Sequence, residues 1–148
     1  MATLRDVMTS NIQSVTAQDN VYEVASMMRQ NNIGMVPVLE NGVLKGVVTD
    51  RDLVTRGIAN KKANSSSISE VMSNQLVVGT PDMTVEEAAR IMADAQVRRL
   101  PVVENNQIVG VVSLGDLALQ PTAQDDAAVA LNEISETHNP QASNDLQA

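Results

Sequence analysis

The stretch Gly46-Val47-Val48-Thr49-Asp50-Arg51-Asp52-Leu53 returns later in the chain as Gly110-Val111-Val112-Ser113-Leu114-Gly115-Asp116-Leu117. Each copy is an apolar β-branched run followed by a hydroxyl residue, with a carboxylate three residues after the hydroxyl. This order is typical of a buried strand that leads directly into a helix, with Thr49 or Ser113 as the N-cap. The two stretches therefore predict two strand–helix units of the same design.

Two interpretations fit the hydroxyl and the carboxylate of each stretch. A capping hydroxyl followed three residues later by an acid is a capping box, although Asp is a weaker partner there than Glu. The same arrangement suits a nucleotide, because a helix N-terminus offers N–H groups to phosphate and a carboxylate can accept both hydroxyls of a ribose diol. A single copy favours the cap, since caps are commoner than ligand sites. The recurrence of the pattern gives the nucleotide interpretation more weight.

The recurrence extends well beyond these two stretches. Residues 7–53 align with residues 71–117 without a gap at an offset of 64, and 16 of the 47 positions are identical. An internal repeat has to be settled before a fold is assigned, and a solenoid usually needs at least three units. Two copies indicate a pseudo-symmetric pair instead.

Periodicity and capping signals predict the order β-α-β-β-α in the first repeat. An Asn20–Glu23 capping box opens a helix, and Asn41-Gly42 is a two-residue hairpin turn. The helix has an apolar face at helical spacing, made of Val21, Val24, Ala25 and Met28. The elements predicted for this repeat are a short helix capped by Thr3, a strand over 14–16, a helix over 21–31, strands over 35–40 and 43–49, and a helix over 50–58.

The second repeat shows the same order of elements. A Thr84–Glu87 capping box opens its long helix, and Asn105-Asn106 marks its hairpin turn. The elements predicted for it are a short helix over 68–72, a strand that starts at 77–78 and is ended by Gly79-Thr80-Pro81, a helix over 85–95, strands over 100–104 and 107–113, and a helix over 115–119.

The rest of the chain is polar and lies between and after the repeats. The connection 59–67 has no periodicity and is predicted to be a solvated linker. After the second repeat, Ala127, Leu131 and Ile134 form a thin apolar stripe, which predicts a C-terminal helix docked on the module or on a partner. The predicted organisation is repeat one over 1–58, the linker over 59–67, repeat two over 68–120, the C-terminal helix over 121–136 and a disordered tail over 137–148.

Composition restricts the chemistry that this chain can perform. It has 148 residues, 43% of them hydrophobic, with Tyr22 as the single aromatic residue, no cysteine and one histidine, His138 in the polar tail. The core must therefore consist of aliphatic and Met side chains. Disulfides, thiolate metal sites and a His-based catalytic pair inside the fold are excluded. We predict no catalytic residue, no metal site and no required cofactor.

The net charge is −8, and much of it lies at the C-terminal end. From Pro121 onward there are five acids and no Lys or Arg, whereas residues 1–120 carry 13 acids and 10 bases. Residues 1–120 are therefore slightly acidic and should not attract polyanions in general. Neither nucleic acid nor an anionic membrane is an expected partner. The sequence shows no membrane-spanning run and no signal-peptide pattern, so the expected location is the cytoplasm.

The ordered set of motifs, present twice in register, resembles a tandem pair of cystathionine β-synthase (CBS) domains, also called a Bateman module. The resemblance covers Leu4–Leu119 and rests on a Val-Met pair near the start of each repeat, a Pro-Val strand and the motif Gly-Val-Val-[Thr/Ser]-x-x-Asp-Leu. It implies an α/β fold in which the two repeats pack through their sheets around a pseudo-two-fold axis. It also implies two clefts between the repeats that often bind AMP, ADP, ATP or a related adenosyl ligand, and a disc-shaped homodimer.

The resemblance implies a role for particular residues of this chain. Asp52 and Asp116 match the acid that binds ribose, and Thr49 and Ser113 match the hydroxyl near ribose or phosphate. The base is expected near the first strand of each repeat, at Thr16 and Thr80. Aliphatic walls and backbone groups would hold the adenine, because the chain has no Trp or Phe. The residues implied to line the clefts are Ile33, Met35, Val36 and Pro37 in the first repeat and Val97, Leu100 and Pro101 in the second.

The repeats differ where the charge of a phosphate would be met. Arg98-Arg99 precedes the strand of the second repeat, whereas Gly34-Met35 stands at that place in the first. Two adjacent arginines suit charge-assisted bonds to phosphate, and the resemblance implies this role, in which Arg51 is expected to join. The alternative is that both arginines are surface residues paired with acids such as Asp94 or Glu104. Equivalent occupancy of the two clefts is therefore not expected.

Three functions remain in view from the sequence. The first is a regulatory sensor that binds an adenine nucleotide and passes its occupancy to an unidentified partner protein or through a homodimer. The second is a ligand-free structural or stress-related dimerisation module, in which the acids only cap helices. The third is an unrecognised hydrolase, which is the weakest because the sequence places no nucleophile and no base. We favour the sensor.

Overall fold

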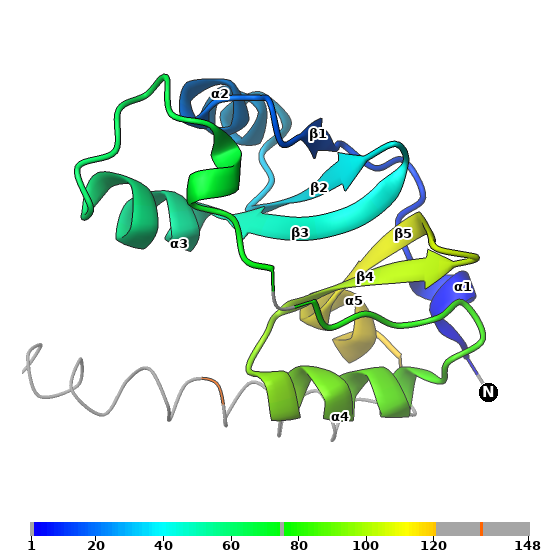
Figure 1. The fold of residues 1–148 in the computed structure, drawn as a ribbon. Coiled ribbons are helices and arrows are strands. Elements are labelled where there is room, and N and C mark those ends of the chain that lie inside the picture. The colour runs from blue at the N-terminus through cyan, green and yellow to red at the C-terminus, as the bar shows by residue number, and fades with distance from the viewer. Residues whose placement is uncertain (1, 75, 121–133, 135–148) are drawn as a thin grey trace, which may run out of the picture. The chain divides into compact units, whose positions relative to one another are not determined.

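The computed structural model describes residues 2–74, 76–120 and Ile134 (Figure 1). The chain folds into two compact units. The first-repeat unit consists of residues 11–76 and 105–108, and the second-repeat unit consists of residues 1–10, 77–104 and 109 onward. The α/β fold class predicted from the sequence is confirmed. The predicted C-terminal helix and tail lie outside the described residues, except for Ile134.

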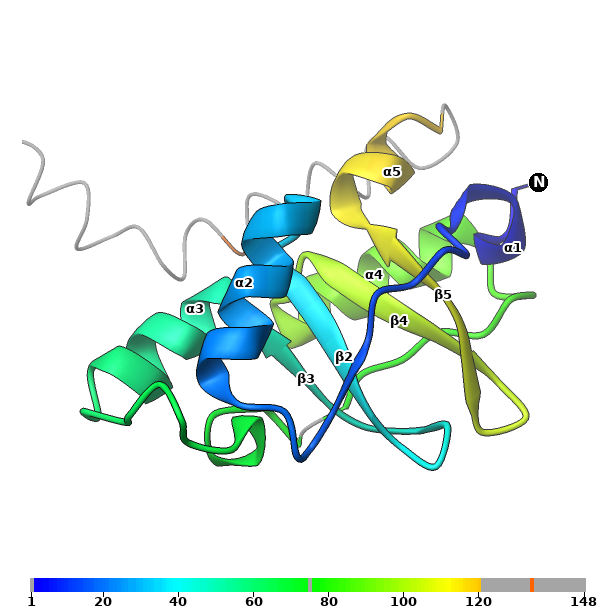
Figure 2. The same cartoon turned by 90° about the horizontal axis from the view of Figure 1, so that it is seen from above.

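In the first-repeat unit a helix covers a small sheet. β1 runs parallel to β2, β2 pairs antiparallel with β3, and α2 lies against the sheet beside β2 (Figures 1 and 2). The β2–β3 turn has φ angles of 53° at Asn41 and 80° at Gly42, as a two-residue hairpin turn requires. The elements of this unit are β1 (Val15–Thr16), α2 (Val21–Asn31), β2 (Met35–Glu40), β3 (Val43–Thr49), α3 (Asp50–Asp52), η1 (Leu53–Ile58) and η2 (Ile68–Glu70).

The second-repeat unit has the same kind of hairpin and helix. Its two strands are neighbours joined by a turn with positive φ at Asn105 and Asn106, and α4 packs against β4. The elements of this unit are α1 (Leu4–Val7), α4 (Val85–Ala95), β4 (Arg99–Glu104), β5 (Gln107–Ser113), of which residues 107 and 108 are counted with the first-repeat unit, and α5 (Leu114–Ala118). Among the described residues of both units, no helix is long and apolar enough to cross a membrane.

Four local predictions need correction. No strand forms at 77–78: Gly79 makes a single parallel bridge with Val102, and Pro81 has no N–H to extend the pairing. The helix over 50–58 is α-helical only at its start and becomes the π-helix η1, where the Thr55 hydroxyl donates to the Arg51 carbonyl and competes with the regular ladder. The segment 68–72 forms only the short 3₁₀ helix η2. Ala25, predicted to be buried, is exposed.

The linker is more than a solvated connection at its C-terminal end. The carbonyls of Asn64 and Ser66 accept hydrogen bonds from the N–H groups of Tyr22 and Val21, both in the first turn of α2. Helix N-termini carry such unpaired N–H groups. The end of the linker therefore helps to cap α2.

The two repeats exchange their leading segments, residues 3–9 and 67–73. Thr3 bridges Thr84 of the second repeat, and Ser67, which lies 64 residues later, bridges Asn20 of the first. The bridges from Thr9 to Val111 and from Ser73 to Val47 follow the same rule. Leu4 and Ile68 are fully buried, each in the core of the unit that contains the other repeat. Each unit is thus built from parts of both repeats.

The first leading segment is itself held by a capping box. The Thr3 N–H donates to the Asp6 carboxylate at 3.0 Å, and the Thr3 hydroxyl donates to the same oxygen at 3.2 Å. The backbone bond, followed by the hydroxyl bond, lowers the pKa of Asp6. A lowered pKa means that the contribution of Asp6 to stability is present above the pKa of the unfolded chain and is lost as the pH falls through the folded value.

The equivalent positions of Gly46 and Gly110 in the two repeats follow from this exchange. A Cβ on Gly46 would lie 2.7 Å from the carbonyl oxygen of Ser73, which belongs to the second leading segment. A Cβ on Gly110 would meet the side chain of Met8, in the first leading segment. Both glycines therefore allow the close approach of a leading segment to a strand.

Gly46→Ala should lower the free energy of unfolding by about 1–3 kcal/mol, because a backbone carbonyl cannot move away cheaply. Gly110→Ala should cost less, since the flexible Met8 side chain can change rotamer. Gly115→Ala is the control: its Cβ would lie 3.7 Å from the Ser113 hydroxyl, its nearest neighbour, and Ala is the better helix former. Denaturant titration of the three variants measures the order. Equal stability of Gly46→Ala and Gly115→Ala would contradict the close approach.

Candidate functional site

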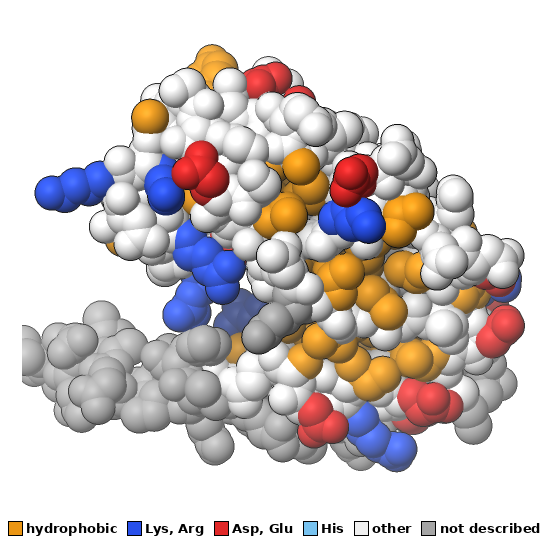
Figure 3. Space-filling view, in the orientation of Figure 1, with side chains coloured by type: hydrophobic (Ala, Val, Ile, Leu, Met, Phe, Trp, Pro, Cys, Tyr) orange, Lys and Arg blue, Asp and Glu red, His pale blue; other side chains and the backbone are white. Residues whose placement is uncertain are grey.

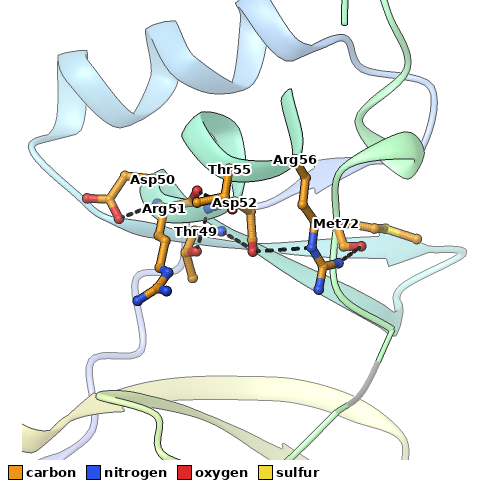
Figure 4. A network of polar contacts seen from close by, with 7 residues as sticks. All are labelled: Thr49, Asp50, Arg51, Asp52, Thr55, Arg56 and Met72. Atoms are coloured by element: carbon orange, nitrogen blue, oxygen red, sulfur yellow. Dashed lines mark hydrogen bonds and ion pairs between the residues drawn. The ribbon is translucent and has the colours of Figure 1, made fainter. Parts of the chain in front are cut away.

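The first capping box, Thr49 and Asp52, lies where β3 passes into α3 (Figure 4). The Thr49 hydroxyl accepts a hydrogen bond from the Asp52 N–H at 3.1 Å, and Oδ2 of Asp52 accepts one from the Thr49 N–H at 2.9 Å. Thr49 has an extended backbone, as an N-cap does. The local sequence therefore holds the Thr49 hydroxyl and the Asp52 carboxylate together at the start of α3.

Only one of the two Asp52 carboxylate oxygens is used in this box. The other, Oδ1, lies 4.0 Å from Nε of Arg56, whose guanidinium also donates to the Met72 carbonyl at 3.2 Å. The Asp52 side chain is 16% exposed. Arg56 is not among the site residues predicted from the sequence, although its position four residues after Asp52 in a predicted helix is a signal for such a pair.

The surroundings of the first capping box are basic. Figure 3 shows basic side chains gathered over α3 and the segment that follows it. Figure 4 shows the side chains of Arg51 and Arg56 on either side of Asp52. Arg51 and Arg56 are the basic residues within four positions of Asp52 along the chain. An anionic ligand near Asp52 would therefore meet positive charge.

The backbone donors of α3 are already engaged. The Asp50 N–H donates to the Gly34 carbonyl at 3.0 Å, and the Arg51 N–H donates to the Asp50 carboxylate at 2.8 Å. Together with the two bonds of the box, these account for all four N–H groups from Thr49 to Asp52. The expectation that this helix start offers free N–H groups to phosphate does not hold here, because the Asp50 side chain occupies the position of an anion.

The second capping box, Ser113 and Asp116, repeats the first with one difference. The Ser113 hydroxyl accepts from the Asp116 N–H at 3.1 Å, and Oδ2 of Asp116 accepts from the Ser113 N–H at 3.0 Å. Leu114 stands in the place of Asp50 and has no side-chain acceptor. Among the described residues, no side chain therefore accepts the N–H of Gly115 in the way that the Asp50 carboxylate accepts the equivalent N–H of Arg51.

Arg98 and Arg99 lie beside the second capping box. The carbonyl of Arg98 accepts the N–H of Leu114 at 2.8 Å, which holds this segment against the start of α5. Both arginine side chains are exposed. Neither makes an ion pair with a described residue, and Glu104, one of the acids considered as a partner, is bound by Arg5 at 3.3 Å. Among the described residues, the arginines are free to meet a ligand.

The structure brings some of the other expected site residues to the boxes. Met35 is opposite Thr49 in the β2–β3 register, so the start of β2 lies beside the first box. The expected lining is buried at Met35, Val36, Pro37, Leu100 and Pro101, and partly buried at Ile33 and Val97.

The two threonines expected near the base are not at the boxes of their own units. Thr16 pairs with Leu39, four residues along β2 from Met35, which is about 13 Å in a strand. Thr80 follows Gly79, which bridges Val102 well beyond Arg99. Within each unit the threonine and the capping box therefore occupy different ends of the strand.

Among the residues that the structure describes, no group of three or more His, Cys, Asp or Glu side chains is placed to hold a metal ion.

Comparison with known proteins gives consistent matches. The family profile of the CBS domain matches residues 4–58 and 68–120. CBS domain-containing protein YhcV of Bacillus subtilis is 44% identical over 135 residues, which cover 91% of this chain and 96% of YhcV. The crystal structure of Hypoxic Response Protein I with two coordinated zinc ions is 30% identical, with a TM-score of 0.73 over 80% of this chain and 98% of that one. The crystal structure of CBSX2 in complex with AMP is 24% identical, with a TM-score of 0.72 over 80% of this chain and 95% of that one.

Proposed function

We propose that this chain, which belongs to the CBS domain family, is a regulatory module that senses an adenine nucleotide through its two capping boxes. One observation carries the proposal. Each box engages one oxygen of its Asp in the helix cap, Oδ2 of Asp52 and Oδ2 of Asp116, so Oδ1 of each acid is the oxygen proposed to accept a ligand hydroxyl, at Asp52 beside the Arg56 guanidinium. The binding of AMP by the structurally similar CBSX2 supports this choice of ligand class.

The proposed contacts divide the ligand between ribose, phosphate and base. Asp52 and Asp116 accept ribose hydroxyls. Arg98, Arg99 and the N–H of Gly115 bind phosphate, because a guanidinium pair and a backbone donor that no described side chain accepts lie at one helix start. The aliphatic residues that precede and begin β2 and β4 contact the base. Phosphorylated ligands therefore prefer the second capping box, where no carboxylate occupies the anion position.

Replacing the box acids by their amides tests this assignment. Asp52→Asn and Asp116→Asn keep the shape and one acceptor oxygen but lose the charged second oxygen. We expect nucleotide affinity to fall by roughly 1.5–3 kcal/mol, about ten- to hundred-fold, while the melting temperature without ligand changes little. Isothermal titration calorimetry with AMP and thermal denaturation measure the two quantities. Asp82→Asn is the matched control, since it makes the same change at an exposed carboxylate outside both boxes.

A second function is favoured by one observation: both boxes are complete as helix caps without any ligand. If the acids only cap helices, each Asn variant should lose about 0.3–1 kcal/mol of stability and affect ligand binding only through folding. The chain would then be a structural dimerisation module. Unchanged AMP affinity in both variants would select this function over sensing.

We further propose that the chain acts as a homodimer. Tyr22, Val54 and Ile58 are exposed large apolar side chains of the first-repeat unit, in which α2 and η1 pack against each other. Exposed apolar groups of this kind commonly mark association surfaces. A dimer would let ligand occupancy at one chain reach the other or a partner protein.

Sedimentation at tens of micromolar is expected to give at least the mass of a dimer. Ile58→Asp should reduce that mass, because a charge placed in an apolar contact is costly to bury. Thr55→Asp, which adds the same charge at an exposed polar position of η1, is the control. A monomer mass that does not change with concentration would contradict dimerisation.

A further inference from the structure

Arg56 connects the first capping box to the second leading segment, residues 67–73. Its Nε lies 4.0 Å from Oδ1 of Asp52, and its Nη1 donates a hydrogen bond to the Met72 carbonyl at 3.2 Å (Figure 4). All three residues belong to the first-repeat unit. One planar guanidinium therefore joins the proposed ribose acid to a backbone carbonyl that lies 16 residues further along the chain than Arg56.

The Met72 end of this link is firmly held. Ile68 and Val71, in the same leading segment, are fully buried in the core of the unit. Ser73 exchanges two backbone hydrogen bonds with Val47 of β3, at 2.8 and 3.1 Å, and the Met72 N–H donates to the Ile68 carbonyl at 3.0 Å. The Met72 carbonyl is thus a fixed acceptor, which can keep the guanidinium in one place beside the first box.

The Asp52 end of the link is weaker and can respond to a ligand. A distance of 4.0 Å from Nε to Oδ1 is that of an ion pair without a hydrogen bond, and the Arg56 side chain is 50% exposed. Such a pair contributes little while water surrounds it. A ligand that covers the box removes water and strengthens the pair, because charges attract more strongly at a lower dielectric constant.

The second repeat has no such link. Gln120, which is uncharged, stands at the position equivalent to Arg56, and Met8 stands at the position equivalent to Met72. Among the described residues, Asp116 makes no ion pair and no side chain donates to the Met8 carbonyl. Both capping boxes are nevertheless complete. Completing a box therefore does not require an arginine at this position, and the role of Arg56 lies elsewhere.

We propose that Arg56 is a positioning residue of the first capping box and couples the Asp52 carboxylate to the seating of the second leading segment. This rests on the proposed function, because the coupling serves sensing only if Asp52 binds ribose. Coupling free energies are reciprocal, so a ligand that strengthens the Asp52–Arg56 pair also holds residues 67–73 more firmly. Occupancy of the first box thereby reaches the leading segment, a route that the second box lacks.

Backbone hydrogen exchange in the ligand-free chain tests the coupling itself. The probes are the N–H groups of Ser73 and Val47, each of which donates to the carbonyl of the other residue. Asp52→Asn should speed their exchange by about two- to fivefold, the size expected for a partly exposed ion pair. In the Arg56→Gln background it should add nothing, because the link is already absent. Equal acceleration in both backgrounds would overturn the proposal.

Arg56→Lys separates the link from the charge. Lysine keeps the charge but has a single nitrogen, which cannot serve Asp52 and the Met72 carbonyl as two nitrogens of a planar guanidinium do. Arg56→Lys should therefore behave like Arg56→Gln in the exchange experiment, and full restoration by lysine would contradict the link. Arg29→Gln, which removes the same charge at an exposed position of α2, is the control and should leave the exchange of Ser73 unchanged.

Saturating AMP tests whether the coupling carries occupancy. Exchange at Ser73 and Val47 should slow in the unmodified chain by at least about twofold more than in Arg56→Gln. If AMP binds and slows exchange equally in both chains, the role of Arg56 is wrong while the proposed function stands. If calorimetry shows that AMP does not bind, the proposed function fails, and the ligand-free experiment alone decides whether Arg56 couples the box to the segment.

Discussion

Replacing Leu4 by Ala is expected to lower the free energy of unfolding by about 2–5 kcal/mol, although the residue lies only four positions from the N-terminus. Leu4 is fully buried in the core of the second-repeat unit together with Val85 and Leu100. Its side chain lies close to Gly79, where an added Cβ would come within 2.7 Å of Cδ1. Removing the side chain should therefore leave a cavity that this closely packed region cannot fill.

Leu119→Ala is the matched control for this prediction. It makes the same change at a side chain that is 76% exposed, so its effect should lie within about 0.5 kcal/mol. Urea unfolding of both variants measures the difference. A loss for Leu4→Ala as small as that for Leu119→Ala would mean that the first leading segment is not part of the core, and the exchange of leading segments would be wrong.

Replacing both Arg98 and Arg99 by Ala should weaken nucleotide binding by about 2–4 kcal/mol, from charge-assisted bonds of roughly 1.5–3 kcal/mol each without simple additivity. Adenosine, which has no phosphate, should bind almost as well as before. The physical reason is that both guanidinium groups are exposed beside the start of α5 and make no ion pair with a described residue. Calorimetry with AMP and adenosine on the same variant measures the ratio.

Lys61→Ala with Lys62→Ala is the control for the loss of two positive charges. These adjacent cations lie in the linker, and Lys62 is already paired with Glu70 at 3.2 Å. Their removal should alter nucleotide affinity only slightly, since salt screens distant charges. Equal losses of AMP and adenosine affinity in the arginine variant would show that the arginines are structural, even if the box acids still bind ribose.

Local signals in the sequence determined much of this fold. The bounds of α2, β2, β3, α4 and β5 agree with the predictions, because caps, β-branched runs and hairpin turns act within a few residues. The hydroxyls and acids of both boxes were also found in this way. At these positions the local preference and the tertiary structure agree, which is common in natural proteins.

Other features depend on contacts far along the chain and were not predictable. Ala25 and Ala89 are identical residues at equivalent positions, yet Ala25 is exposed and Ala89 is fully buried in the core of its unit. Nothing in the sequence near Leu4 indicates that it packs in the core of the other repeat. In the site, the engagement of the Arg51 N–H by Asp50 became visible only in the structure. That bond distinguishes the first capping box from the second more clearly than the presence of Arg98 and Arg99 beside the second box does.

The proposal that the box acids bind the ribose of an adenine nucleotide is tested most directly by calorimetry of the unmodified chain with AMP and with its 2′,3′-dideoxy analogue. The two ligands share base and phosphate and differ only in the hydroxyls that Asp52 and Asp116 are proposed to accept. We expect AMP to bind at least about tenfold more tightly, a difference of about 1.4 kcal/mol, and this preference to disappear in the Asp52→Asn, Asp116→Asn double variant. Equal affinity of the unmodified chain for both ligands, or no binding of either, would contradict the account.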